Sequence, residues 1–385
     1  MGVEFRLGRQ DHLKVEDFLA RSPSGVSAIV LNTKAAGHQR AAAEVAAAAG
    51  VQVLYDPATE RCTTPGYQLP GHPYGDNLLD VNVLAADPAA RLRLMIAVID
   101  GHPDEATTIT PPHFLVEDER SANLNVALAA DTRHNTDLPV RATVILARRY
   151  GAKAAPELAR QYAQAGIDQV ELRITPLGGD NESIAKIGSV FAMLDAFQAV
   201  GLTVVLGWSG NIGQAAVALG HADHYSVGVG MNEQVNHAAT ISRQQKPPPE
   251  PAPGEKPRTS GAVAGIYLPG LAATVSRAAG AALLAHTDIR TRVGCRIDAC
   301  GFTLDNPTRD VRGHYLHART HEMNEILRQP APWRATREID RLQRAVELRD
   351  LVNNKYRTKD VPELKSRTLR SLIDDLQLEQ AARTA

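Results

Sequence analysis

Apolar and polar positions along the chain follow two alternating patterns. Short runs of β-branched and other apolar residues predict strands, and the alanine-rich stretches between them carry apolar residues at helical spacing. The predicted strands cover residues 26–31, 51–55, 107–110, 142–147, 169–174, 203–206, 224–229 and 263–268. The predicted helices include residues 37–49, 88–99, 156–165, 183–199 and 212–219. This alternation favours a (β/α)8 TIM-type barrel, with a doubly wound open parallel sheet as the structural alternative.

Two segments fall outside this repeat. Residues 244–260 contain the run Lys-Pro-Pro-Pro-Glu-Pro-Ala-Pro-Gly and no large apolar residue, which predicts a mobile, disordered proline-rich loop between strands seven and eight. From Arg334 onward, apolar residues at helical spacing predict a helical extension that braces the barrel or forms a homodimer or heterodimer. We therefore expect a barrel over residues 1–290, and a metal-clip-like segment with C-terminal helices over residues 291–385.

Composition narrows the class of protein. The chain has 385 residues, of which 44% are hydrophobic, so it can bury a full core. Its net charge of −1 gives no global basic field that would indicate a nucleic-acid partner. Basic residues do outnumber acidic ones between Arg290 and Arg357, where they form either a basic face or ordinary intrahelical pairs. The N-terminus lacks the apolar core of a signal peptide, and no stretch approaches the roughly 18 apolar residues of a membrane span, so we expect a cytoplasmic protein.

Cysteine usage points to metal chemistry. A reducing cytoplasm argues against a structural disulfide framework for the three cysteines, and Cys62 stands alone as a small side chain. Cys295 and Cys300 lie five positions apart, with histidines downstream of them. Thiolates and imidazoles are the ligands that zinc prefers in structural sites. The candidate ligands of a thiophilic metal ion are Cys295, Cys300, His314 and His317, with His321 as an alternative imidazole.

Two carboxylates are candidate catalytic residues, because chemistry in a parallel barrel takes place at the carboxyl ends of the strands. Asp56 follows the second predicted strand, where it can serve in acid–base or covalent catalysis. The same position also suits an Asx-turn or a helix cap. Glu233 follows a Gly-x-Gly turn after the seventh predicted strand, where backbone amides can approach a ligand, although such glycines are also ordinary turn residues.

Other residues at the predicted barrel mouth are candidates for binding a substrate. Trp208 follows the sixth predicted strand and can stack on a planar base or sugar, or simply pack. Arg173 lies on the same side of the fifth predicted strand as Glu171, so it either clamps an anion or pairs with that carboxylate. The candidate substrate-binding residues are His113, Arg173, Trp208, Asn211 and Tyr267.

The order of these features resembles the tRNA-guanine transglycosylases and their relatives that insert deazaguanines into DNA. In that family a β/α barrel carries a zinc clip after its last strand, with a Cys-x-Cys-x-x-Cys run and then an Arg-Ala-Tyr-Leu-His-His type helix and a glutamate. Cys295 and Cys300 match the outer spacing of the run, and Arg312-Gly-His-Tyr-Leu-His317 is similar to the helix, followed by Glu322 or Glu325. Residues 219–233 are similar to a family segment that ends in Gly-Gly-Leu-x-Val-Gly-Glu.

The chain departs from the family pattern at three places. Ile297 occupies the position of the middle cysteine, no His-Asn pair lies near Trp333, and residues 265–269 carry no carboxylate on the strand predicted as the eighth.

The resemblance implies base exchange or cleavage at an N-glycosidic bond in a nucleic acid. Asp56 would be the nucleophile or base, Glu233 an acceptor for the base or sugar, and Trp208 a stacking wall, while zinc would be structural. Two other functions stay open. One is a small-molecule barrel lyase or isomerase that binds phosphate near strands seven and eight, and the other is a non-catalytic nucleic-acid-binding barrel subunit.

Overall fold

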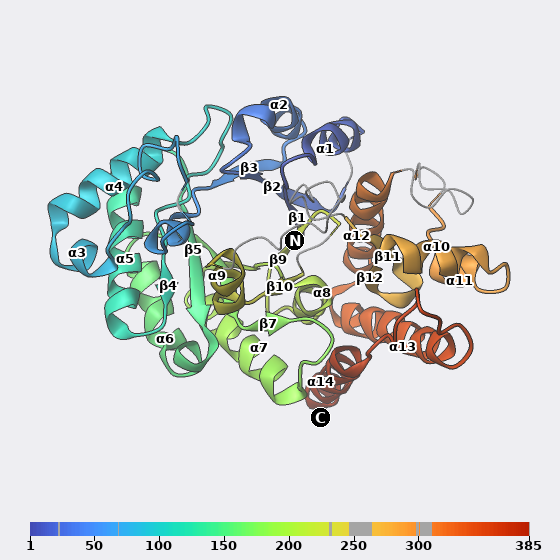
Figure 1. Ribbon diagram of the computed structural model, residues 1–385. Coiled ribbons are helices and arrows are strands. Elements are labelled where there is room, and N and C mark those ends of the chain that lie inside the picture. The colour runs from blue at the N-terminus through green and yellow to red at the C-terminus, as the bar shows by residue number, and fades with distance from the viewer. Residues whose placement is uncertain are drawn as a thin grey trace.

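The computed structural model describes residues 1–21, 24–67, 69–230, 233–245, 264–297, 300 and 310–384. The chain has an α/β fold in which eight parallel strands form one curved sheet flanked by helices (Figure 1). The strands are β1 (Gly2–Arg6), β2 (Val26–Asn32), β3 (Gln52–Asp56), β4 (Leu115–Val116), β5 (Arg141–Ala147), β6 (Gln169–Thr175), β8 (Thr203–Leu206) and β9 (His224–Gly228). They are ordered β3-β2-β1-β9-β8-β6-β5-β4 across the sheet. The prediction of a parallel α/β architecture is confirmed.

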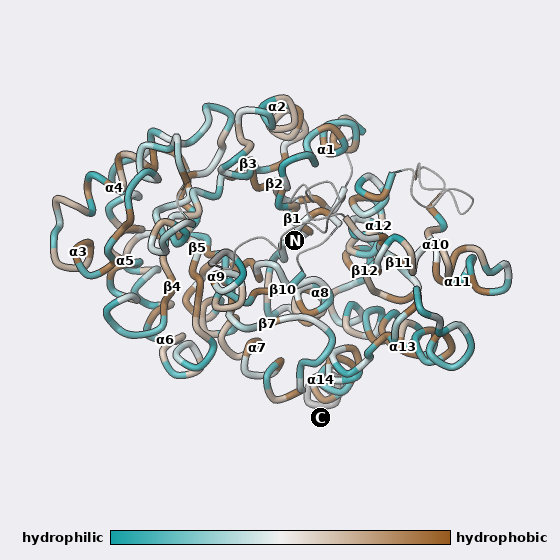
Figure 2. Tube along the Cα trace, in the orientation of Figure 1, coloured by the Kyte–Doolittle hydropathy of each residue, from teal (hydrophilic) through white to brown (hydrophobic). Residues whose placement is uncertain are grey.

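Helices alternate with these strands along the chain. They are α1 (His12–Leu19), α2 (Arg40–Ala48), α3 (Val81–Ala86), α4 (Pro88–Asp100), α5 (Glu119–His134), α6 (Arg148–Gln164), α7 (Ile184–Gln198) and α8 (Gly210–Leu219). Asp87 begins α4 by accepting a hydrogen bond from the Ala89 amide, with Pro88 at the first helical position. Apolar positions, brown in Figure 2, run along β4 and β5, where the sheet packs against its helices. None of the described helices has the length and hydropathy needed to cross a membrane.

The prediction that residues 263–268 form the eighth strand of the sheet is wrong. β1 belongs to the sheet instead. β1 pairs in parallel with both β2 and β9, so its residues fill the place that the prediction gave to residues 263–268. The described part of that segment is β11 (Ile266–Leu268), which pairs antiparallel with β12 (Ala273–Val275) in a separate two-stranded sheet. The absence of a carboxylate on residues 265–269 therefore says nothing about the end of a barrel strand.

The predicted strand at residues 107–110 forms only isolated bridges. Leu54 of β3 pairs with Thr108, and Ile109 pairs with Val140 next to β5, both in parallel. Pro111 and Pro112 follow directly, and proline has no amide hydrogen for the ladder. Regular pairing resumes only at β4, which lies beside β5.

The C-terminal part of the chain is helical and packs on one side of the sheet (Figure 1). Its helices are α10 (Arg277–Ala285), α11 (Arg290–Val293), α12 (Val311–Leu327), α13 (Ala331–Lys355) and α14 (Arg367–Thr384). α12 contacts α1 and β1, whereas α13 contacts α8 and α14 contacts α7. A second hydrophobic core, which contains Cys295 and Cys300, begins at Ala264, upstream of the boundary predicted at residue 290. The domain boundary at residue 290 remains a prediction. From residue 246 onward, the predicted proline-rich loop lies outside the described residues.

Candidate functional site

A cavity of about 1250 Å³ lies at the carboxyl ends of the parallel strands. Asp56 at the end of β3, Arg173 on β6 and Trp208 after β8 all line it, so the structure brings together three of the residues singled out in the sequence. Arg6, the last residue of β1, and Glu60, from a 3-10 helix at Thr59–Thr63, line the same cavity. The predicted barrel mouth therefore corresponds to a cavity that is lined by charged side chains.

Asp56 is held by two arginines. Its Oδ2 accepts hydrogen bonds from Arg6 Nη2 and from Arg173 Nη2, the latter at 2.9 Å. Its Oδ1 accepts the Ala58 amide at 3.0 Å, as an Asx-turn would. The side chain is 13% exposed. The carboxylate thus has a fixed orientation at the cavity wall.

Glu171 lies beneath Asp56 and joins the same arginines. Arg6 Nη1 contacts its two oxygens at 2.9 and 3.0 Å, and Arg173 Nη2 contacts Oε2 at 2.9 Å. Ser226 on β9 donates to Oε1 at 2.9 Å. The pairing of Arg173 with Glu171 that alternation suggested is present, and Asp56 joins it.

Both carboxyl groups are ionised over the ordinary pH range. Burial opposes ionisation of Asp56, but Arg173 and Arg6 outweigh it and hold the pKa of this carboxyl below its ordinary value. Burial likewise opposes ionisation of Glu171, and Arg173, Arg6 and Arg141 hold its pKa well below the ordinary value. A carboxyl with such a low pKa is a poor proton acceptor, so Asp56 suits charge stabilisation or nucleophilic attack better than general-base catalysis.

Trp208 has a strained backbone. Its φ is +55°, in the left-handed region that a bulky residue rarely adopts. The guanidinium carbon of Arg6 lies 5.2 Å from the indole centroid, within cation–π range. The ring is half-buried and lines the cavity. A strained aromatic residue on a cavity wall is typical of a ligand-binding position.

His113 does not line the cavity. The residue is buried and lies between two carboxylates, with Nε2 at 3.5 Å from Asp56 Oδ1 and 3.4 Å from Glu60 Oε2. Both of these carboxylates line the cavity.

Glu233, Asn211 and Tyr267 lie in a second cluster rather than on this cavity. Glu233 accepts hydrogen bonds from Tyr315 at 2.5 Å and from Arg319, both on α12. Tyr267 donates to both oxygens of Glu322 at 2.9 Å. Asn211 donates to the carbonyl oxygen of Ala272 at 2.9 Å and accepts from Arg341 Nη2 at 3.1 Å.

The buried arginine Arg319 is the centre of this second cluster. Its guanidinium carbon lies 4.4 Å from the Tyr267 ring centroid, and its nitrogens contact Glu233 and Glu322. The cluster therefore fastens the segment after β9 to the C-terminal helices. Gln234, the next residue, lines the cavity, so Glu233 anchors part of its wall.

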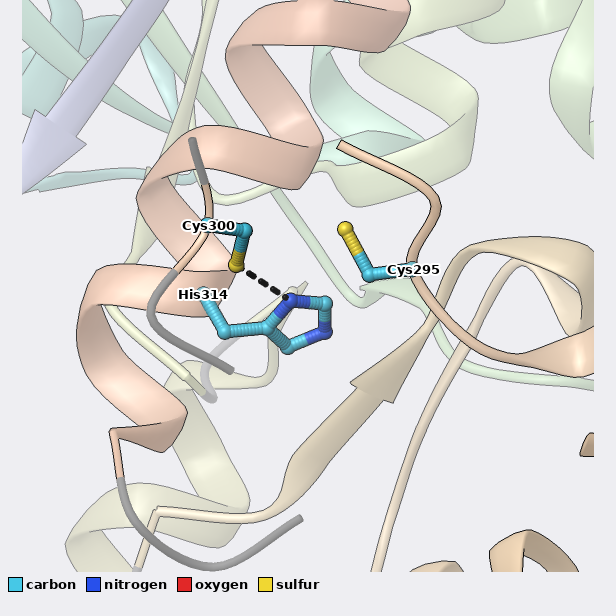
Figure 3. A group of neighbouring side chains, drawn as sticks. All are labelled: Cys295, Cys300 and His314. Carbon is cyan, nitrogen blue, oxygen red and sulfur yellow. Dashed lines mark hydrogen bonds between the residues drawn. The ribbon is translucent and has the colours of Figure 1, made fainter. Parts of the chain in front are cut away.

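Cys295, Cys300 and His314 form a candidate metal centre, with side chains that point toward one another (Figure 3). Their donor atoms all lie within 4.8 Å of one another, and all three residues are buried. Cys300 Sγ lies 3.5 Å from His314 Nδ1. Tetrahedral zinc with ordinary bond lengths places a sulfur and a nitrogen ligand about 3.6 Å apart, so the three residues fit zinc.

The protonation of these side chains also suits a metal. His314 Nε2 lies 2.6 Å from the carbonyl oxygen of Tyr267, to which it donates, and this leaves Nδ1 as the nitrogen with a free electron pair. The interaction with Cys300 lowers the pKa of the Cys295 thiol to about 4 against the effect of burial, with His314 adding to the shift. A thiolate and a neutral imidazole are the forms that bind zinc.

Two other histidines considered as zinc ligands lie elsewhere. The ring of His317 packs edge-on against Phe18 of α1, with centroids 5.0 Å apart, and His321 is exposed. Among the described residues, the group that can hold a metal contains His314 alone of these histidines.

Several residues of the cavity wall were not predicted from the sequence. Arg6 was missed because β1 was missed, although Val3, Phe5 and Leu7 alternate with Glu4 and Arg6 as in a strand. Glu60 lies in a short 3-10 helix and carries no sequence signal. Comparison of the chain with protein-family models and with curated proteins gives no match in either case.

Proposed function

We propose that this protein is a transglycosylase-like enzyme that binds a purine base at the Asp56 cavity and acts on its N-glycosidic bond in a nucleic acid. The observation that carries the proposal is the convergence of an ionised carboxylate, Asp56, and a strained aromatic residue, Trp208, on one cavity. Purine recognition needs an aromatic face to stack on, and glycosidic chemistry needs a carboxylate near the anomeric carbon. The family resemblance of the sequence implies the same chemistry.

The fold that this function uses is a closed (β/α)8 barrel. Residues 107–110 lie between β3 and β5, and their bridges at Leu54–Thr108 and Ile109–Val140 support closure of the sheet at this place. The amide of Thr107 donates to the Val53 carbonyl at 2.9 Å, which adds to the contact with β3. A closed barrel places the ends of all its strands around one mouth.

The role of Asp56 follows from its contacts. Cleavage of an N-glycosidic bond develops positive charge at the sugar, and a fixed carboxylate stabilises that charge or attacks the anomeric carbon. Arg6 and Arg173 keep Asp56 ionised and oriented. Trp208 lines the cavity beside Arg6, where its indole can stack on the base.

The rim of the cavity suits a ligand with phosphate groups. Arg9, Arg61 and Arg277 line it, and in the described part of the chain no carboxylate forms an ion pair with any of them. Arginine binds phosphate through its planar set of donors. A nucleotide or nucleic-acid backbone would supply the missing negative charge.

Zinc at Cys295, Cys300 and His314 has a structural role in this proposal. None of the three residues lines the cavity, so a bound ion would not touch the substrate. It would tie α12 to the chain after α11 and to β11, through the hydrogen bond between His314 and Tyr267. Zinc supplies folding free energy in such sites.

The test is a base-exchange assay with radiolabelled guanine and either bulk tRNA or duplex DNA. The wild-type protein is expected to incorporate label into one of these acceptors, and Asp56→Ala is expected to abolish incorporation with an unchanged circular dichroism spectrum. Asp137→Ala, at an exposed aspartate that does not line the cavity, is the matched control and should behave as wild type. Binding of nucleic acid without exchange would favour the non-catalytic barrel subunit, and neither activity would favour a small-molecule enzyme.

A further inference from the structure

The ring of His113 presents a nitrogen to two anions. Nδ1 lies 3.0 Å from the carbonyl oxygen of Pro111, which only accepts, so Nδ1 carries a hydrogen. Nε2 then faces Asp56 Oδ1 at 3.5 Å and Glu60 Oε2 at 3.4 Å. A bare Nε2 would direct its electron pair at both carboxylates, whereas a second proton makes it a donor to them. The surroundings of His113 therefore favour an imidazolium.

The charges of the groups that are linked to His113 by ion pairs also favour an imidazolium at this position. The carboxylates of this buried network are Glu4, Asp56, Glu60 and Glu171, and its guanidinium groups belong to Arg6, Arg141 and Arg173. The four negative charges exceed the three positive ones by one, and a protonated His113 balances them. Unbalanced charge in a buried site is costly.

The neighbouring groups do not supply this charge. Burial lowers the pKa of His102, which interacts electrostatically with Asp56, to about 4. Burial also lowers the pKa of His237, which interacts electrostatically with Glu60. Arg61 follows Glu60 in the chain, but its guanidinium carbon lies over the Tyr67 ring at 4.0 Å. His113 is left as the partner of Glu60.

The two carboxylates beside His113 differ in their other contacts. Asp56 accepts from Arg6, Arg173 and the Ala58 amide. Glu60 Oε2 is buried and has no hydrogen-bond partner among the described residues, apart from the approach of His113. Both carboxylates line the cavity, and His113 does not. Asp56 is therefore fixed as an anion by its three donors. Burial raises the pKa of Glu60, but the contact with His113 outweighs this effect and holds that pKa below the ordinary value, so Glu60 is an ionised carboxylate beside the His113 ring.

The geometry points to Glu60 as the acid–base residue of this cavity, with His113 as the positioning residue that stores its proton. The inference rests on the proposed function. When the bond from the anomeric carbon to the outgoing base breaks, that base must gain a proton, which moves from His113 Nε2 to Glu60 and then to the base. When the incoming base forms its bond, it releases one proton, which returns by the same path. The exchange is balanced and needs no further reactant.

The first test measures the proton on His113 directly. ¹⁵N NMR of histidine-labelled protein resolves protonated from bare ring nitrogens, and His113→Gln assigns the signal among the 13 histidines. We expect both nitrogens of His113 to be protonated at pH 7 in the wild type. Glu60→Gln should change the ring-nitrogen signals of His113, because it removes a neighbouring negative charge. Glu157→Gln, at an exposed glutamate, should leave them unchanged.

A bare Nε2 at pH 7 in the wild type, or unchanged ring-nitrogen signals of His113 in Glu60→Gln, would overturn the inference. This readout needs no substrate, so it holds whether or not the protein exchanges bases.

The second test uses the guanine-exchange assay. Glu60→Gln should reduce the rate by about 100-fold or more, and His113→Gln should remove the fall in rate that the wild type shows as pH rises, because the active form carries the proton. If the wild type exchanges guanine and Glu60→Gln does so at the same rate, the acid–base inference fails and the proposed function stands. If the wild type exchanges no base, the proposed function fails, and NMR alone decides whether His113 and Glu60 share a proton.

Discussion

The guanidinium of Arg6 lies over the indole of Trp208, with the Arg6 Cζ 5.2 Å from the ring centroid. Arg6 simultaneously binds Asp56 and Glu171. One arginine thus fixes the aromatic face and the carboxylate relative to each other. Because Trp208 has a positive φ, this arrangement includes a strained residue at the cavity wall.

Two substitutions of Trp208 test its backbone strain separately from purine binding. A non-glycine residue in the left-handed region costs about 1–2 kcal/mol, which glycine avoids. We expect Trp208→Gly to be more stable than Trp208→Ala by about 1 kcal/mol in urea unfolding, although glycine normally destabilises a chain. Both variants should lose purine binding. An alanine variant as stable as the glycine variant would show that the backbone is relaxed at this position.

Glu171 should stabilise the fold in a pH-dependent way. Its pKa is depressed in the folded state, so its contribution is present above the unfolded pKa of about 4.3 and is lost as pH falls through the folded value. Glu171→Gln leaves Arg6 and Arg173 with fewer partners and should cost about 3–5 kcal/mol at pH 7.

Urea unfolding across pH 3–7 checks this prediction, and the difference between variant and wild type should shrink below about pH 4. Glu157→Gln, at an exposed residue, should change the free energy of unfolding by less than about 0.5 kcal/mol. A difference that stays constant with pH would contradict an ionised Glu171 in the folded state.

Zinc binding should depend on Cys295 and not on Cys62. We expect about one zinc ion per chain by elemental analysis, and its loss together with a lower melting temperature in Cys295→Ser. Cys62→Ser is the matched control, because Cys62 is also buried but lies in a different hydrophobic cluster. Equal zinc content in both variants would refute the metal centre.

Tyr267 allows the metal centre and the second polar cluster to be tested separately. Tyr267→Phe removes the hydroxyl that binds Glu322 but keeps the backbone carbonyl that accepts from His314. The loss of a hydrogen bond to a charged group should cost about 1.5–3 kcal/mol of unfolding free energy. Zinc content should not change. A variant that unfolds as the wild type does would show that Arg319 and Arg341 satisfy Glu322 without the hydroxyl.

The local parts of the fold could be predicted from the sequence. Runs of β-branched residues located six strands of the parallel sheet, and residue type together with spacing identified Cys295, Cys300 and His314. β1 was missed although its alternation of apolar and charged residues was visible, because its charged positions Glu4 and Arg6 face the buried network rather than solvent.

The long-range parts could not be predicted in this way. Asp56 meets Arg6 and Arg173 from positions 50 and 117 residues away in the chain, and this contact depends on the register of the whole sheet. Glu233 pairs with Arg319 because α12 packs beside the sheet, and nothing near Glu233 in the sequence indicates that packing. His317 was a plausible ligand by spacing, but its side of α12 faces Phe18.

The most direct test of the central claim is the fluorescence of Trp208 during titration with guanosine 5′-monophosphate. The chain has two tryptophans, so Trp333→Phe leaves Trp208 as the sole reporter, and Trp208→Phe leaves the exposed Trp333 as the control. If a purine stacks on Trp208, the nucleotide will quench the Trp333→Phe protein saturably, whereas ribose 5-phosphate and the Trp208→Phe protein will show no such change. No saturable quenching at millimolar nucleotide, or equal quenching of both proteins, would contradict a purine site at the Asp56 cavity.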